Sequence, residues 1–268
     1  MQTSKCREIV WDFYKEQGRH DLPWRRTRSP YKILVSEIML QQTQVERVLP
    51  YYKKWLQQFP TVQSLAQVPL SHVLIAWQGL GYNRRAKALW ESARIVTNEY
   101  GGRFPRGRTE LEALPGIGHY TAGAVLSFAH NSPEVLLETN IRTAITHHFF
   151  KNIDVVSDTE LMEVLTKVLD QTNPREWNWA LMDYGAHLKR SGIKINSKSK
   201  TYTKQSVFKG SDREIRGAIL RALVGGKKSR TALLKLYGTD REKQTEIQII
   251  KLLQENLIVK KGRNFDLP

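Results

Sequence analysis

The stretch that most constrains the fold is residues 111–140, which read LEALPGIGHYTAGAVLSFAHNSPEVLLETN. Pro115 ends the first helix of this stretch because its ring cannot continue the hydrogen-bond ladder. Gly116 and Gly118 follow, and glycine adopts positive φ or admits another backbone without a Cβ clash. The next helix is predicted to start near Tyr120, so free N–H groups and the positive dipole end point out of the turn. The sequence therefore predicts an anion site in this turn, which a phosphate fits.

A polar triplet, Glu138, Thr139 and Asn140, separates an apolar segment from the next apolar helix. An isolated LPGIG is as typical of an ordinary helix–turn–helix joint as of a functional turn. A carboxylate that follows a buried-looking helix favours the functional turn. The combined pattern resembles the helix-hairpin-helix DNA glycosylase superfamily.

Glu37 lies within residues 31–42, where apolar side chains recur near helical spacing. A carboxylate in such a run either faces solvent or is a functional group held in a cleft, and periodicity alone favours solvent. The surrounding string, SEIMLQQTQVERVLPYY, closely resembles the signature of the MutY-type adenine glycosylases within the superfamily. Further blocks similar to this branch, in the same order, are LPWRR, GLGYNRRAKAL, GGRFP and ALMDYGA. The resemblance covers residues 20–188 and indicates that Glu37 is functional.

Helical periodicity, with Pro, Gly or Asn between the blocks, predicts an all-α protein of about ten short helices. After an N-terminal helix and the block around Glu37, the predicted helical blocks are 61–78, 84–100, 109–114, 120–130, 140–149, 157–171 and 176–188. The resemblance implies a two-lobed helix-hairpin-helix DNA glycosylase core over residues 1–188. It places a six-helix barrel lobe near residues 30–130, a second lobe in the flanking segments, and DNA across the cleft between the lobes.

Composition excludes several classes of protein. The chain lacks an apolar run of about eighteen residues, the length at which a membrane helix is expected, and its N-terminal segment does not read as a signal peptide. The single cysteine, Cys6, excludes an internal disulfide and a four-thiolate metal cluster. We therefore expect no membrane association and a cytoplasmic, nucleoid-associated protein.

The charge is concentrated toward the C-terminus. Residues 189–268 carry 20 Lys and Arg against 7 Asp and Glu, which supplies +13 of the formal net charge of +16. Positive charge of this density favours a polyanionic partner. A solvated basic tail is the alternative, but helical apolar spacing in the same region favours a folded basic module.

The chemistry follows from the bond that a DNA glycosylase breaks. The nucleotide must first leave the base stack. Cleavage then places positive charge on the sugar and negative charge on the departing base, so an acid and a carboxylate lower the barrier from both ends. By resemblance, Glu37 protonates the purine ring nitrogen, Tyr120 hydrogen-bonds within the site, and Asn140 helps to hold water and the sugar-phosphate.

The residue at position 120 decides between two classes of glycosylase. Bifunctional relatives carry a lysine there, and a lysine amine can form a Schiff base with the sugar. Tyr120 cannot, so we expect a monofunctional enzyme without lyase activity.

Glu138 departs from the family pattern, which is Asp-Gly-Asn where this chain has Glu-Thr-Asn. The carboxylate stands one methylene farther from the backbone, and a displacement of about 1 Å can cost roughly a hundredfold in rate. The alternative is that Glu138 only stabilises the positive end of the following helix. Because Asn140 keeps its place in the pattern, catalysis by Glu138 is the favoured interpretation.

The resemblance also implies a base pocket and DNA contacts. Gln42 and Tyr82 match positions that enter the stack around the extruded base, and loop packing is the competing interpretation for Tyr82. Further DNA contacts are expected from Thr43, Leu114, Gly116, Gly118 and His119. Trp24, Arg25, Leu40 and Asp183 match the lining of the family's base pocket, although Trp and Leu in such places are more often core residues.

The chain departs most from the family after Asp183. Four cysteines that hold an iron–sulfur cluster usually follow, whereas here Lys189 takes the approximate place of the first cysteine and no cysteine follows. We therefore expect no cofactor and a basic linker over residues 189–211. We also expect that the chain does not carry the family's domain that inspects the opposite oxidised guanine.

Residues 212–268 instead read as three helices and a hairpin, which resembles a winged helix. In that interpretation Lys227, Lys228 and Arg230 start the second helix and Lys243 belongs to the groove-reading third helix. Such modules bind DNA or dock proteins.

These features indicate a monomeric, monofunctional adenine-DNA glycosylase that acts on double-stranded DNA with a mispaired or damaged base, adenine opposite G or 8-oxoguanine. Two alternatives remain. The same scaffold acts on T or U opposite G, or the chain binds lesions with little turnover because Glu138 is degenerate. The sequence does not name the lesion, because the part that would read the opposite base has been replaced.

Overall fold

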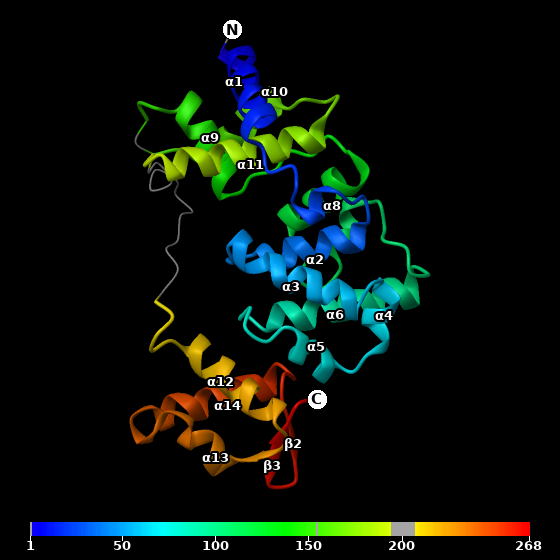
Figure 1. Ribbon diagram of the computed structural model, residues 1–268, viewed down its shortest axis with the longest axis vertical. Coiled ribbons are helices and arrows are strands. Elements are labelled where there is room, and N and C mark those ends of the chain that lie inside the picture. The colour runs from blue at the N-terminus through cyan, green and yellow to red at the C-terminus, as the bar shows by residue number, and fades with distance from the viewer. Residues whose placement is uncertain (1, 154, 194–206) are drawn as a thin grey trace. The chain divides into compact units, whose positions relative to one another are not determined.

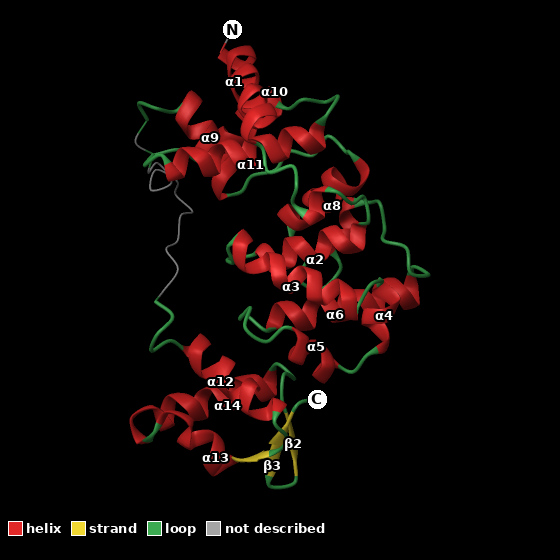
Figure 2. Cartoon of the chain, viewed as in Figure 1, coloured by secondary structure: helices red, strands yellow, loops and turns green. Residues whose placement is uncertain are grey.

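The computed structural model describes residues 2–153, 155–193 and 207–268 (Figure 1). Most of the expected linker, residues 194–206, lies outside this set. The elements of the N-terminal part are α1 (Gln2–Gln17), the 3₁₀ turn η1 (Pro23–Arg25), α2 (Pro30–Leu40), α3 (Val45–Gln58), α4 (Val62–Gln67), α5 (Leu70–Ala76), α6 (Arg84–Glu99), α7 (Arg108–Glu112), α8 (His119–His130), α9 (Thr139–Phe149), α10 (Asp158–Val168) and α11 (Pro174–Arg190). The C-terminal elements are α12 (Asp212–Val224), β1 (Lys228–Ser229), α13 (Arg230–Leu234), the 3₁₀ turns η3 (Lys235–Tyr237) and η4 (Thr239–Arg241), α14 (Glu242–Gln254), β2 (Val259–Lys261) and β3 (Asn264–Asp266). The expected helical protein is confirmed, and in the described ranges the strands belong to the C-terminal region (Figure 2).

The chain divides into two compact units. The first unit comprises Met1–Glu37, Arg106–Glu112 and Ile117–Lys204. The second comprises Ile38–Pro105, Ala113–Gly116 and Gln205–Pro268. The domain bounds expected from the sequence, 1–188, 189–211 and 212–268, stay a prediction.

The first unit is built around α11, which packs against α9 and α1 (Figure 1). Pro174 occupies the first turn of α11, where a missing backbone N–H costs nothing. Trp177 is fully buried, and its ring centroid lies 5.6 Å from that of Trp11 on α1. Gly185 faces α9, because a Cβ at this position would stand 1.9 Å from the carbonyl oxygen of Asn140. The sequence therefore places a glycine where the backbones of α11 and α9 approach each other.

Two short helices, α4 and α5, follow α3 in the second unit. Thr61 caps α4 through a reciprocal capping box with Ser64, which satisfies otherwise unpaired N–H groups. Pro69 then precedes α5, so the single block predicted over residues 61–78 is wrong: it is two helices. The proline cannot donate an N–H to a continuous helix, which explains the break.

The C-terminal region forms three helices and a three-stranded antiparallel sheet in the order β1-β3-β2. Lys228 and Lys260 both pair with Phe265 of the central strand, which is buried. The three helices and the hairpin expected from the sequence are confirmed. The expectation that Lys227 and Lys228 start the second helix is wrong, because Lys228 lies in β1 and the helix begins at Arg230. A two-residue strand is too short for an alternating pattern to reveal.

The glycine turn of residues 115–118 separates α7 from α8, as expected. Gly116 has φ +75°, and a Cβ there would stand 2.7 Å from the Cβ of Ala88, so both the conformation and the space favour glycine. Gly118 has φ −91° and nothing lies within 4 Å of a Cβ built on it. Gly118 therefore leaves open space at the first turn of α8 rather than a strained backbone.

No helix in the described ranges is long and apolar enough to cross a membrane.

Candidate active site

Glu37 is a buried carboxylate on α2, in the first unit. Glu37 is 8% exposed, and the apolar residues around it in α2 are also buried. Burial raises the pKa of Glu37 to about 7, and the nearby Glu138 carboxylate also raises it, while a hydrogen bond from Tyr120 and the charge of Arg25 lower it. A carboxyl group with this pKa is substantially protonated near neutral pH, which a general acid requires. The interpretation that Glu37 faces solvent is wrong.

Tyr120 lies in the first turn of α8 and is half-buried. Burial raises its pKa well above the ordinary value, and the charges of Glu37 and Glu138 raise it further. The phenol therefore stays protonated and acts as a hydrogen-bond donor to Glu37. This geometry provides the hydrogen bond within the site that the resemblance implied.

Glu138 caps the N-terminus of α9. Its Oε1 accepts the backbone N–H of Asn140 at 2.8 Å and that of Ile141 at 2.8 Å. Burial raises the pKa of Glu138, although these two N–H groups and the charges of Lys189 and Arg19 lower it. The capping role considered for Glu138 is therefore present. The same carboxylate also interacts electrostatically with Glu37 and Tyr120, so capping does not remove it from the site.

Asn140 links Glu138 to the end of α11. Its Nδ2 donates to Glu138 Oε2 at 3.2 Å, and its Oδ1 accepts from Lys189 Nζ at 2.8 Å. Both ends of the amide are thus occupied, one by a carboxylate and one by an ammonium. Asn140 is held in one orientation beside the carboxylate.

Asp183, expected in the base pocket, is bound by two arginines. Arg25 donates to it from Nη1 at 2.6 Å and from Nη2 at 2.9 Å, and Arg19 donates from Nε at 2.6 Å. Burial alone would raise the pKa of Asp183, but the hydrogen bonds and charges of the two arginines outweigh it and lower the pKa. Asp183 is 2% exposed and Trp24 is 6% exposed, so both belong to the buried framework of the first unit.

Two residues of the second unit expected to contact DNA have strained backbones. Gln42 has φ +54° and Tyr82 has φ +48°, values that side chains other than glycine seldom adopt. Arg85 connects the loops that carry them: its guanidinium donates to the carbonyl of Gln41 at 2.6 Å and to that of Gly81 at 3.1 Å. Burial lowers the pKa of Arg85 to about 10. Strain held by a buried hydrogen-bonding group is typical of functional loops.

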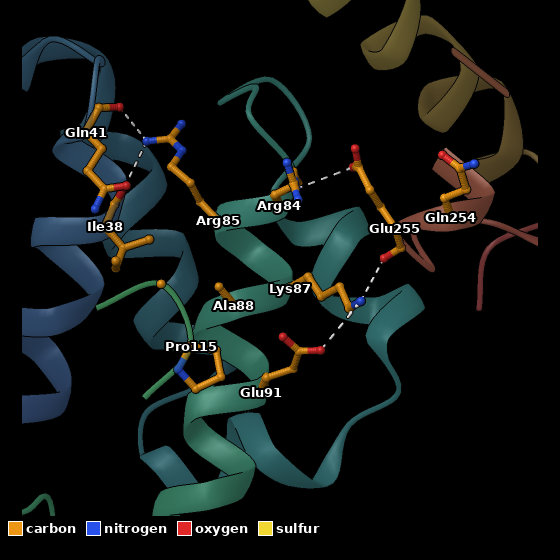
Figure 3. Close-up of a pocket in the computed structure, with 11 residues that line it drawn as sticks. Ile38, Gln41, Arg84, Arg85, Lys87, Ala88, Glu91, Pro115, Gln254 and Glu255 are labelled. Carbon is orange, nitrogen blue, oxygen red and sulfur yellow. Dashed lines mark hydrogen bonds and ion pairs between the residues drawn. The ribbon is translucent and has the colours of Figure 1, made fainter. Parts of the chain in front are cut away.

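Gln41, next to Gln42, and Arg84, two residues after Tyr82, line a cavity of 560 Å³ in the second unit (Figure 3). Arg84, Arg85 and Lys87 line it, together with Pro115 and Gly116 of the turn. Glu255, which follows α14, reaches it from the C-terminal region: its carbonyl accepts from Lys87 Nζ at 2.7 Å, and its carboxylate lies 3.8 Å from Arg84 Nε. Three cations, Arg84, Arg85 and Lys87, therefore line the cavity together with two acids of the same unit, Glu91 and Glu255.

Tyr82 is also contacted by the C-terminal region. Arg213 on α12 donates from Nη1 to the Tyr82 hydroxyl at 2.8 Å, and its guanidinium lies 5.2 Å from the ring centroid. Loop packing, the competing interpretation for Tyr82, is thus present in this structure. The contact with Arg213 and the predicted insertion of Tyr82 into DNA are compatible, because Arg213 is a cation and DNA is a polyanion.

The remaining predicted DNA contacts are scattered over both units. Leu114 is buried, Thr43 is half-buried, and Gly116, Gly118 and His119 are exposed, with His119 Nδ1 2.9 Å from Glu112 Oε1. Leu40, expected in the base pocket, is half-buried. In the C-terminal region Lys227 and Lys243 are exposed, Lys228 is half-buried, and Arg230 pairs with Glu246 at 2.6 Å.

Four residues that shape these sites were not predicted from the sequence in these roles. Lys189 donates to Asn140, Arg19 binds Asp183, Arg85 joins the two strained loops, and Arg213 contacts Tyr82. The sequence marks Lys189 as unusual, because it takes the approximate place of the family's first cluster cysteine. The other three are arginines in basic sequence, where nothing distinguishes a framework residue from a solvated one.

An iron–sulfur cluster does not fit this chain. Four-thiolate clusters need four cysteines, and Cys6 is the one cysteine in the sequence. Cys6 is buried, which raises the pKa of its thiol to about 11 and keeps it protonated. Within the described ranges, no group of three or more His, Cys, Asp or Glu side chains is arranged to hold a metal ion.

Comparisons with known proteins show the family of this chain. Residues 35–171 match the model of a family described as HhH-GPD superfamily base excision DNA repair protein. An adenine DNA glycosylase of Buchnera aphidicola subsp. Baizongia pistaciae is 36% identical over 218 residues, which cover 78% of this chain and 61% of that protein. An adenine DNA glycosylase of Mycolicibacterium smegmatis is 38% identical over 241 residues, which cover 83% of this chain and 81% of that protein. The chain thus spans about three fifths of the first relative and four fifths of the second.

Among solved structures, a thermostable thymine-DNA glycosylase superposes with a TM-score of 0.61 at 31% identity. The match covers 69% of this chain and 88% of that one. The fold is therefore shared by proteins whose names specify different bases, and the base is decided by the side chains of the site.

Proposed function

Because this chain belongs to the HhH-GPD superfamily of base excision DNA repair proteins and to its MutY-like adenine-specific branch, we propose that it removes mispaired adenine from double-stranded DNA. One observation carries the proposal: a buried carboxyl group, Glu37, whose pKa is raised to about 7, lies near a second acid, Glu138. A carboxyl with a raised pKa beside a second carboxylate can supply an acid and an anion in one site.

The proposed reaction uses these groups in turn. Glu37 donates its proton to a ring nitrogen of the extruded adenine, which leaves as a neutral base. The Glu138 carboxylate stabilises the positive charge that develops on the sugar. Asn140 holds the attacking water and the sugar-phosphate, and Tyr120 orients Glu37. General acid catalysis of this kind contributes on the order of 10²- to 10⁴-fold in rate.

DNA recognition is assigned mainly to the second unit. Gln42 and Tyr82 enter the stack, supported by Arg85, and the glycine turn binds a backbone phosphate. The order of helices and strands in residues 212–268 supports a winged-helix-like module, and its exposed lysines, Lys227 and Lys243, supply sequence-independent affinity. We propose that the protein acts as a monomer.

A second candidate function is removal of T or U opposite G. The 31% identity to a thymine-DNA glycosylase favours it. Thymine lacks the purine ring nitrogen that Glu37 is proposed to protonate, so the position of this acid favours adenine. A lesion-binding protein with little turnover is the remaining alternative, and it requires that Glu138 fail as a catalytic group.

A panel of duplexes that contain A:G, A:8-oxoguanine, T:G or U:G separates these functions. Free base is measured under single turnover with enzyme in excess. The proposal predicts adenine release from the first two duplexes. Release of thymine or uracil instead supports the second candidate, and tight binding without any release supports the lesion-binding protein.

Strand cleavage provides a further check. Because Tyr120 has no amine, product strands should break only after alkali treatment, and borohydride should trap no covalent adduct. A trapped adduct would show that a lysine elsewhere in the site attacks the sugar.

A further inference from the structure

Lys189 lies in the last turn of α11, at the approximate place where relatives carry their first cluster cysteine, and here its side chain contacts Asn140. Its Nζ donates to Asn140 Oδ1 at 2.8 Å. Asn140 in turn donates to Glu138 at 3.2 Å. The three residues form one hydrogen-bonded series, from an ammonium through an amide to a carboxylate.

The series fixes the direction of the Asn140 amide. An ammonium group can only donate hydrogen bonds and an ionised carboxylate can only accept them. The amide oxygen must therefore face Lys189, and its NH₂ group must face Glu138. Without Lys189, the amide could rotate and no longer present its NH₂ group to the carboxylate.

Gly185 of α11 allows the contact between Lys189 and Asn140. Gly185 stands one turn before Lys189 on the same face of α11, and a Cβ there would meet the Asn140 backbone at 1.9 Å. Residues four apart on a helix lie on one face. The glycine thus brings α11 against the first turn of α9, and Lys189 reaches Asn140 from the next turn.

Charge gives Lys189 a second effect. The groups that act electrostatically on Glu138 come from four elements: Lys189 on α11, Arg19 before η1, Glu37 on α2 and Tyr120 on α8. Burial raises the pKa of Glu138, and Lys189 and Arg19 oppose this. Arg19 is already bound to Asp183 at 2.6 Å, so Lys189 is the cation whose side chain is directed to the Asn140–Glu138 pair.

We propose that Lys189 is a positioning residue of the reaction, which orients the Asn140 amide and places a positive charge beside the Glu138 carboxylate. This inference rests on the proposed function, since it assigns Lys189 a part in base release. It also explains how a chain without cluster cysteines uses the end of α11: the position carries a charge for the active site.

The test compares Lys189→Met, Lys189→Arg and the control Lys167→Met in single-turnover base release from an A:G duplex across pH. Lys167 is an exposed lysine of the same unit, so its variant removes the same charge away from the site. Lys189→Met should lose on the order of ten- to a hundredfold in rate, since small displacements of reacting groups have effects of this size. The acidic limb of its pH profile should move to higher pH, because Glu138 without the ammonium takes up a proton more readily. Lys189→Arg should recover most of the rate and the original limb.

Three results would overturn the inference: a wild-type rate in Lys189→Met, a slow Lys189→Met with an unchanged acidic limb, or no recovery by Lys189→Arg. Melting temperatures of all variants identify a folding defect, and Lys189→Gln replaces any variant that does not fold. A readout without catalysis separates this inference from the proposed function. The Glu138 carboxyl is titrated by ¹³C NMR in a Glu37→Gln background, with and without Lys189→Met. Its pKa should rise on loss of the ammonium even if the wild-type protein releases no base, and an unchanged pKa contradicts the inference.

Discussion

The candidate active site of the first unit, around Glu37 and Glu138, differs in its charged groups from the loop-and-cavity region of the second unit, around Arg84, Lys87 and Tyr82. In the candidate active site, Glu37 and Glu138 are carboxylates whose burial raises their pKa values. In the second unit, Arg84 and Lys87 line the cavity, where Arg84 lies 3.8 Å from the Glu255 carboxylate and Lys87 donates to a carbonyl, and Arg213 lies over the Tyr82 ring. Protonating a base needs an acid kept from solvent, whereas holding a polyanion needs cations that solvent can reach. Catalysis and affinity should therefore respond to different substitutions.

The largest expected effect is on catalysis. Glu37→Gln removes the proposed proton donor while it keeps the shape of the side chain, so single-turnover base release should fall by about 10²- to 10⁴-fold. Duplex affinity should stay near wild type, because a buried residue of the first unit does not supply phosphate contacts. A rate within a few-fold of wild type would show that Glu37 is structural and that the first unit does not supply the proton for base release.

The same substitution should stabilise the fold at high pH. A carboxyl whose folded pKa is raised contributes stability below its unfolded pKa and loses it as pH rises through the folded value, here about 7. Glu37→Gln avoids this cost, which is on the order of 3 kcal/mol above pH 7. Denaturant unfolding at pH 5 and pH 8.5 measures it: the stability difference between variant and wild type should increase with pH.

The next effect concerns the buried framework of the first unit. Asp183→Asn removes one partner of a buried pair and leaves Arg25 and Arg19 without their carboxylate, which should cost about 3–5 kcal/mol of stability. Asp12→Asn, in an exposed pair with Lys15, is the matched control and should change stability by less than about 1 kcal/mol. Equal effects of the two substitutions would show that Asp183 is not part of the framework.

The smallest effect is expected from the basic C-terminal region. Replacing Lys227, Lys228 and Lys243 with Gln should make the plot of log K against log salt shallower by roughly 0.9 for each lysine that meets a phosphate. Matched and mispaired duplexes should lose affinity equally, and the rate on saturated DNA should not change. A control triple, Lys5, Lys54 and Lys167 to Gln, removes the same charge elsewhere. If the first triple instead abolished discrimination between A:G and A:8-oxoguanine, the module would read the opposite base.

The sequence predicted the helical elements well, because helix breaks are local events. Pro115 and Gly116 mark a turn whichever residues pack around it, and the periodicity of α11 identifies its buried face. Pro69 was a comparable signal, and the continuous apolar spacing on both sides of it concealed the break. β1 was missed because two residues carry no pattern.

The sequence predicted those residues of the candidate site that lie within motifs, but not the contacts between residues distant in sequence. SEIMLQQTQ identified Glu37 and the turn identified Tyr120, but their protonation depends on burial, which involves residues distant in sequence. Lys189 and Asn140 are separated by 49 positions, and their contact needs the close approach at Gly185. Arg85 and Arg213 were indistinguishable from other surface cations until their partners were known.

The central claim is that a protonated Glu37 releases the base, and the pH dependence of single-turnover adenine release at saturating enzyme tests it most directly. The rate should form a bell. It should fall at high pH as Glu37 ionises, with an apparent pKa near 7, and at low pH as Glu138 takes up a proton. The two values belong to the interacting pair rather than to single residues. Adenine release that stays constant or rises from pH 7 to pH 9 would contradict the account, because ionised Glu37 has no proton to give.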